Sequence, residues 1–198
     1  MDESIAHFDG FFKDMASIMD QIDRNVLRDQ VTALFTLRAR KGRLFILGVG
    51  GSAANASHAV NDFRKLCHIE AYAPTDNVSE LTARINDEGW DSSFVAWLKV
   101  SHLTNNDMLL VLSVGGGNAA KQVSMNIVKA LQYANEVGTH ILGIVGRDGG
   151  ETKKLGHDVL VIPALHVDWV TPCTEAFQAV IWHALVSHPT LQAQKTKW

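Results

Sequence analysis

Apolar side chains recur along this chain in two different patterns, and the change of pattern predicts the elements. Residues 4–40 carry large apolar side chains every three or four positions, which is typical of two amphipathic helices. Four later segments are continuous apolar runs, typical of strands that are covered on both faces of a sheet: 44–47, 108–112, 140–145 and 158–163. Helical patterns follow the first run and occupy residues 80–102, 120–137 and 174–191. The alternation predicts an α/β fold with a doubly wound parallel sheet flanked by helices.

One domain accounts for the whole length. The chain has 198 residues, with neither an internal repeat nor a low-complexity linker that would mark a boundary. Lys41-Gly42 is a helix stop and turn, so residues 1–40 are expected to form a helical region for packing or oligomer contacts. Residues 41–198 are expected to form the α/β core.

Composition narrows the classes of partner. Hydrophobic residues make up 46% of the chain and charged residues 20%, which is enough for one sizeable core. The net charge of -3 gives no electrostatic case for binding nucleic acid or an anionic membrane. Neither a signal-peptide pattern nor an apolar run of about 18 residues is present. Cys67 and Cys173 form no C-x-x-C motif. We therefore expect a cytoplasmic protein with no membrane partner.

Glycine-rich segments follow three of the predicted strands, at residues 48–52, 113–118 and 146–150. Ligands of open α/β sheets bind beyond the carboxyl ends of the strands, where free backbone N–H groups attract anions. The spacing matches neither the dinucleotide fingerprint nor a P-loop, and glycines also serve tight packing. Together, the three exits favour a crevice for a small phosphorylated molecule.

Two pairs of reactive side chains lie on predicted helices. His58 and Asp62 are four residues apart and share a helix face, so they can meet on a metal or a substrate. Glu175 and His183 are eight residues apart, about 12 Å along a helix. The residues alone favour a surface hydrogen-bonded pair for His58 and Asp62, and two unrelated side chains for Glu175 and His183.

Several of these segments together resemble the SIS (sugar isomerase) domain family, and within it the phosphoheptose isomerases. The resemblance rests on residues 50–58 (Gly-Gly-Ser-Ala-Ala-Asn-Ala-Ser-His), Asn86-Asp87-x-Gly89, residues 146–150, and Glu175 with His183. It spans nearly the whole chain.

The resemblance implies a set of site residues. One divalent ion per subunit, most plausibly zinc, would be bound by His58, Asp62, Glu175 and His183. Asp62 or Glu175 would be the general base, and His183 the general acid. The substrate and its phosphate would lie on Gly50, Gly51, Ser52, Asn86, Asp87, Ser113, Gly115, Gly116, Gly117 and Asn118.

This chain departs from the family pattern at three places. Asp62 replaces a glutamate, Glu175 replaces a glutamine, and residues 114–117 lack most hydroxyls of the family's phosphate loop. We therefore expect main-chain N–H groups at the starts of helices after Gly51 and Gly117 to hold the phosphate. The helix after the loop is expected to be about one turn longer than in the isomerases.

The activity that the resemblance implies is aldose–ketose isomerisation. The expected substrate is sedoheptulose 7-phosphate, converted through an enediol to D-glycero-D-manno-heptose 7-phosphate in a homotetramer. The alternative is a non-catalytic protein of the SIS fold that senses a sugar phosphate or docks on a protein partner.

Overall fold

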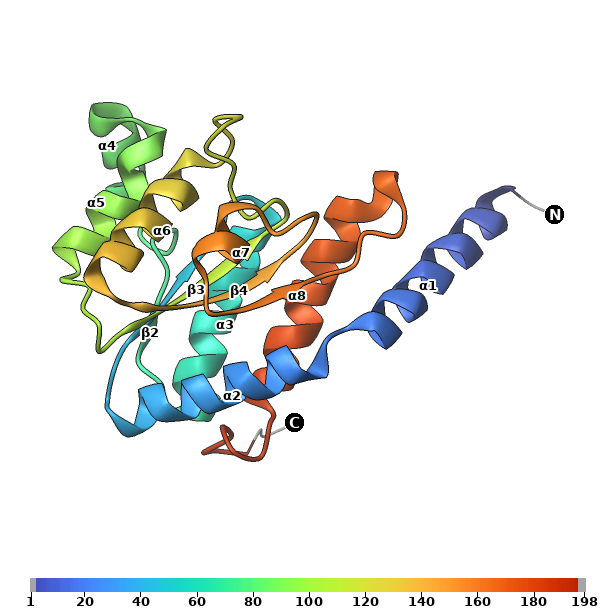
Figure 1. The fold of residues 1–198 in the computed structure, drawn as a ribbon, viewed down its shortest axis with the longest axis horizontal. Coiled ribbons are helices and arrows are strands. Elements are labelled where there is room, and N and C mark those ends of the chain that lie inside the picture. The colour runs from blue at the N-terminus through green and yellow to red at the C-terminus, as the bar shows by residue number, and fades with distance from the viewer. Residues whose placement is uncertain (1–2, 196–198) are drawn as a thin grey trace.

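The computed structural model describes residues 3–195 and contains a five-stranded parallel sheet (Figure 1). Its strands follow the spatial order β2-β1-β3-β4-β5. They are β1 (Leu44–Leu47), β2 (Ala71–Tyr72), β3 (Met108–Ser113), β4 (His140–Val145) and β5 (Asp158–Val161). The predicted fold class, a parallel α/β sheet flanked by helices, is confirmed.

Eight α-helices surround the sheet within the described residues. They are α1 (Glu3–Gln21), α2 (Arg24–Ala39), α3 (Gly51–Cys67), α4 (Val78–Glu88), α5 (Ser93–Val100), α6 (Met125–Val137), α7 (Gly150–Leu155) and α8 (Val170–Val186). Two short 3-10 turns, Trp90–Ser92 and Val167–Trp169, precede α5 and α8. None of the helices between residues 3 and 195 has the length and apolar character needed to cross a bilayer.

The sheet divides the core into two layers because successive side chains of a strand point to opposite faces. Leu44 and Ile46 of β1 pack with α2, α3 and α8 on one face. Phe45 and Leu47 pack with α5 and α6 on the other. This two-sided burial is why the strands are apolar at every position.

Several element boundaries differ from those predicted. The segment 80–102 is divided at Gly89, whose φ of 84° ends α4 and starts a new turn. The segment 120–137 becomes helical only at Met125. The last helix lies earlier than predicted, at Val170–Val186 instead of 174–191. The two-residue strand β2 and the six-residue helix α7 are too short to give a periodic signal, and neither was predicted.

The strand order reverses between β1 and β3. After β1 the chain crosses through α3 to β2 at one edge, then returns to β3 on the other side of β1. Ligand crevices of such sheets open at this reversal, outside the carboxyl ends of the strands. Residues 48–52 and 113–118 lie there.

Helix α1 extends away from the rest of the molecule (Figure 1). Its inner side contacts the ring of Trp169 through His7 and Phe11. Its outer side leaves Phe8 and Phe12 more than half exposed, at 56% and 64%. An apolar stripe of this kind on a projecting helix favours contact with another protein surface.

A buried ion pair fixes the start of the sheet. Asp107 is 2% exposed and accepts hydrogen bonds from the backbone N–H and the guanidinium of Arg43, and from Thr104. Burial by itself would raise the pKa of Asp107, but the hydrogen bonds from Arg43 and Thr104 outweigh it and lower this pKa. The pair joins the residue before β1 to the residue before β3.

Replacing Asp107 by Asn should lower the free energy of unfolding at pH 7 by about 2–4 kcal/mol, because Arg43 loses its charged partner. Urea unfolding measures this difference. Since the folded-state pKa is lowered, the contribution is complete above the unfolded pKa of about 3.9 and is lost as pH falls through the folded value. The matched control Asp29→Asn, which breaks the exposed pair with Arg28, should cost less than about 1 kcal/mol. An equal loss in both variants, or a difference that grows as pH falls below about 3.9, would contradict this assignment.

Candidate functional site

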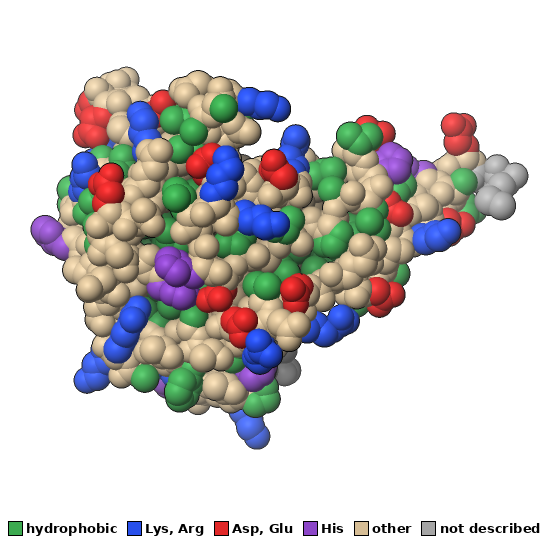
Figure 2. Space-filling model, viewed as in Figure 1, with side chains coloured by type: hydrophobic (Ala, Val, Ile, Leu, Met, Phe, Trp, Pro, Cys, Tyr) green, Lys and Arg blue, Asp and Glu red, His purple; other side chains and the backbone are tan. Residues whose placement is uncertain are grey.

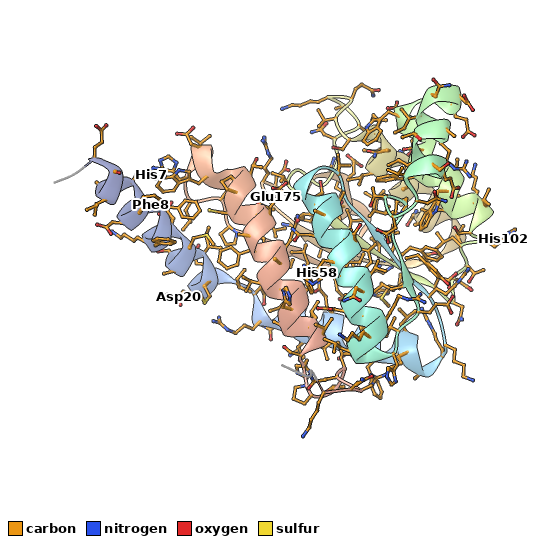
Figure 3. The ribbon with its side chains drawn as sticks, turned by 180° about the vertical axis from the view of Figure 1, so that it is seen from behind. His7, Phe8, Asp20, His58, His102 and Glu175 are labelled. Atoms are coloured by element: carbon orange, nitrogen blue, oxygen red, sulfur yellow. The ribbon has the colours of Figure 1, made fainter. Side chains whose placement is uncertain are left out.

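Helices α3 and α8 lie side by side and bring three potential metal ligands together (Figure 3). Each of His58, Asp62 and His183 offers one ligand atom, and these atoms lie within 4.8 Å of one another. His58 and Asp62 come from one face of α3, as their spacing predicts, with Nε2 and Oδ2 3.9 Å apart. Two imidazoles and a carboxylate are a donor set that suits zinc and similar divalent ions.

A hydrogen bond fixes the tautomer of the neutral His183 ring. Its Nδ1 lies 2.7 Å from the carbonyl oxygen of Ala179, which can only accept, so Nδ1 carries the hydrogen and donates it. In the neutral imidazole the lone pair is then on Nε2. Trp182 is fully buried, and its ring stacks on the His183 ring with centroids 3.5 Å apart. The His58 ring meets the Trp182 ring edge to face, with centroids 4.7 Å apart. The imidazoles therefore rest against a rigid aromatic surface.

Asp62 is the buried member of the group. Only 5% of the residue is exposed, whereas His58 and His183 are open to solvent. Its Oδ1 accepts a hydrogen bond from Asn61, and its Oδ2 faces His58. A buried carboxylate requires a cation or further donors, so a bound metal ion fits this position. A cavity of about 340 Å³ lies beside Asp62 and His183.

Hydrogen bonds from Asn55 fix α3 against α8. The Asn55 side-chain amide donates to the backbone carbonyl of Glu175 at 3.0 Å and to the side-chain oxygen of Gln178 at 3.1 Å. Gln178 is fully buried and in turn donates to the carbonyl of Ile144 in β4. These bonds fix the position of α3 along the axis of α8. They therefore fix the position of His58 relative to His183.

The structure does not place Glu175 in the metal group, contrary to the expected set of four ligands. Eight residues along α8 separate it from His183 by about 12 Å. Its carboxylate lies instead against Gly51 at the start of α3: a Cβ on Gly51 would be 2.6 Å from Glu175 Cδ (Figure 3). Glycine leaves room for this carboxylate, and the positive end of the helix dipole favours it there.

The glycine loop after β3 also differs from the expectation. No helix begins after Gly117: residues 118–123 form a turn, closed by two backbone hydrogen bonds between Asn118 and Val123 of 2.9 and 3.0 Å. Residues 118–124 therefore belong to the loop, and α6 begins only at Met125. The carbonyls of Gly116 and Gly117 accept the N–H groups of Thr152 and Glu151 in the first turn of α7. The loop thus supplies carbonyl oxygens that accept hydrogen bonds from the first N–H groups of α7.

The other predicted substrate-binding residues differ in exposure and in hydrogen bonding. Ser113 is 7% exposed, and its hydroxyl accepts the Gly116 N–H, so it closes the loop. Ser52 is 1% exposed, whereas Gly50 is open, with nothing within 4 Å of a Cβ placed on it. Asn86 and Asp87 are exposed near the end of α4 and hydrogen-bond to each other.

A cavity of about 560 Å³ opens at the carboxyl ends of β3 and β4. Gly115, Gly117 and Asn118 line it, as predicted for substrate-binding residues. Lys121 and Arg147 also line it, and the prediction assigned neither a role. Lys121 was missed because residues 120–137 were interpreted as one helix. Ser124 just before Met125 is of a helix-capping type, but its φ of 52° and the lack of a side-chain capping hydrogen bond show that it does not cap α6.

The cysteines do not belong to the site chemistry. Cys67 is fully buried, and burial raises the pKa of its thiol to about 11. It therefore remains protonated at neutral pH and is a poor metal ligand.

Comparison with known proteins agrees with the fold and the motifs. The family model of the SIS domain matches residues 10–146. A phosphoheptose isomerase from Syntrophotalea carbinolica is 30% identical over 168 residues, covering 81% of this chain and 82% of that protein. One from Helicobacter pylori strain P12 is 29% identical over 167 residues, covering 82% and 81%. Among solved structures, phosphoheptose isomerase GmhA from Neisseria gonorrhoeae superposes with a TM-score of 0.78 at 23% identity, covering 91% of this chain and 95% of that one. The chain belongs to the SIS domain family, in which phosphoheptose isomerases are its relatives.

Proposed function

We propose that this protein is an aldose–ketose isomerase that converts sedoheptulose 7-phosphate into D-glycero-D-manno-heptose 7-phosphate. The observation that carries the proposal is the group of His58, Asp62 and His183 on the α3–α8 face, in a chain whose relatives are phosphoheptose isomerases. A protein that only sensed a sugar phosphate would have no need for a buried carboxylate between two imidazoles.

The chemistry requires one base and one acid on adjacent atoms of the sugar. Asp62 takes a proton from C1 of the ketose, and the electrons of that bond form the C1–C2 double bond of an enediol. The oxygen on C2 receives a proton from Nε2 of the doubly protonated His183 ring as its carbonyl bond opens, a role that this nitrogen fills only while it binds no metal. In the second half, His183 takes the proton of the oxygen on C1, and C2 receives a proton from Asp62, which leaves the aldehyde. Asp62 is the preferred base because it lies beside His183, whereas Glu175 lies two turns of α8 away.

We further propose that the metal is zinc, one ion per subunit, held by His58, Asp62 and His183. A divalent ion bound here would supply a Lewis acid for the substrate carbonyl, in place of the proton from His183. Three protein ligands leave a position open for substrate, which is typical of catalytic zinc. The hydrogen bond from His183 to Ala179 orients the ring, as outer hydrogen bonds of metal ligands commonly do.

The protein is proposed to act as a homotetramer. The exposed apolar stripe of α1 offers a contact surface. The cavity beside Asp62 and His183 shares no lining residue with the one at the ends of β3 and β4. We propose that association of subunits brings the two cavities, each from a different subunit, together into one substrate site. The two free, buried cysteines agree with the expected cytoplasmic, reducing location.

Purified protein supplied with zinc should interconvert the two heptose phosphates, and Asp62→Asn should lower kcat at least about 100-fold, the usual scale for a positioned proton transfer. His183→Ala should abolish turnover. Product formation is measured by NMR or a coupled assay, with circular dichroism to verify folding. The control Asp29→Asn, on the exposed side of α2, should keep full activity. A wild-type protein that isomerises neither heptose phosphate with zinc present would contradict the proposal.

Metal content tests the ligand set separately from activity. After equilibration with zinc and dialysis, the wild-type protein should retain one ion per chain by elemental analysis. His58→Ala and Asp62→Asn should each lose it, because two ligands rarely hold zinc. Glu175→Ala should retain it, since Glu175 lies outside the group. Loss of the ion in Glu175→Ala would contradict the set of three and would show that Glu175 of a neighbouring subunit completes the shell.

A further inference from the structure

Two cationic side chains line the cavity at the ends of β3 and β4 without acidic partners. Lys121 and Arg147 are both exposed, and neither forms an ion pair or side-chain hydrogen bond within residues 3–195. Asp148 is the one acidic residue of the lining, and its Oδ1 accepts the N–H of Gly150 at 3.1 Å. The lining therefore carries a net positive charge, on a protein whose net charge is -3. Across the face seen in Figure 2 as a whole, acidic and basic side chains are interspersed.

Lys121 is held on an ordered turn. Its backbone N–H donates to the Asn118 side chain at 2.9 Å, and Asn118 is also paired with Val123 across the base of the turn. Gln122 adds a side-chain hydrogen bond of 2.7 Å to the carbonyl of Ala119. The extra residues of the loop thus carry the Lys121 ammonium to the cavity on a fixed support.

Arg147 reaches the same cavity from the next strand. Its φ of 52° turns the chain sharply as it leaves β4. The aliphatic part of its side chain passes Gly115, with Arg147 Cδ 3.9 Å from the position of a Cβ there. A hydrogen bond of 3.2 Å from the Gly146 N–H to the Ser113 carbonyl ties the two strand exits together. The positions of the two cations are therefore linked through the sheet.

Two of the helix starts nearby are poorly placed to hold an anion. The N–H groups of Glu151 and Thr152 at the start of α7 donate to the glycine loop. The start of α3 faces the Glu175 carboxylate, which repels a phosphate. The Ser113 hydroxyl accepts the Gly116 N–H and keeps its own hydrogen, but the residue is only 7% exposed. Side-chain charge therefore has to supplement the backbone donors of the glycine loop.

We propose that Lys121 and Arg147 are the phosphate-binding and specificity-determining pair of this protein. They take over the task of the hydroxyls that its glycine loop lacks. The ligand class is a small molecule with a terminal phosphate dianion; the identity of the sugar rests on the proposed function, whereas the binding of phosphate does not. Arg offers a planar fork to two phosphate oxygens, and Lys adds a mobile point charge. A cavity of about 560 Å³ is of the size that small ligands occupy.

Calorimetric titration of the full-length protein with inorganic phosphate, and separately with sedoheptulose 7-phosphate, tests the pair. Lys121→Met and Arg147→Gln should each weaken binding of both probes about tenfold or more. The charge-retaining Lys121→Arg and Arg147→Lys should recover most of the affinity, which a merely structural role would not produce. Wild-type affinity should fall as salt is raised, because the charges are exposed. The control Lys41→Met, in the turn before β1, removes an equal charge and should change nothing.

In the isomerase assay, Lys121→Met should raise KM for the heptose phosphate with a smaller effect on kcat, because the phosphate is remote from the reacting carbons. Affinities within twofold of wild type in both charge-removing variants, or no phosphate binding by the wild-type protein, would overturn the inference. If phosphate binding depends on Lys121 and Arg147 but no heptose phosphate is isomerised, the proposed function fails and this inference stands.

Discussion

The contact between α3 and α8 is the constraint on which the candidate site depends. His58 and Asp62 belong to one helix and His183 to the other, more than 110 residues later, so only the packing of these helices makes them neighbours. Asn55 fixes that packing through two hydrogen bonds, and Gln178 extends it to β4. Small side chains at Ala56 and Ala59, both fully buried, allow the close approach.

The same contact separates two functions that the sequence had combined. Glu175 and His183 are eight residues apart on α8. His183 therefore lies beside His58 and Asp62, whereas Glu175 lies at the start of α3. The carboxylate predicted as a fourth ligand thus occupies the place predicted for phosphate. The glycine loop has few hydroxyls. Lys121 and Arg147 are the cationic side chains that line the cavity beside it. Under the two proposals made above, the proton-transfer groups lie on the α3–α8 face and the anion is held by side-chain charge at the strand ends.

What the sequence could predict follows the range of the interactions involved. Buried strands such as 108–112 are apolar at every position because both faces are covered, and the His58–Asp62 pair needs only helix geometry. The turn at 118–123 was not predictable from local signals: Asn118 accepts the Lys121 N–H as a helix cap would, yet pairing with Val123 closes the chain into a turn. The position of Glu175 depends on the absence of a side chain at Gly51, a contact 124 residues away in the sequence.

The most direct test of this account is a crystal structure of the zinc-loaded protein, with anomalous diffraction measured at the zinc edge. The account predicts one anomalous peak per chain, with ligand distances of about 2.0–2.2 Å to His58, Asp62 and His183 and an open coordination position. A peak at any other place, or no peak at this group in protein that has retained zinc, would contradict it.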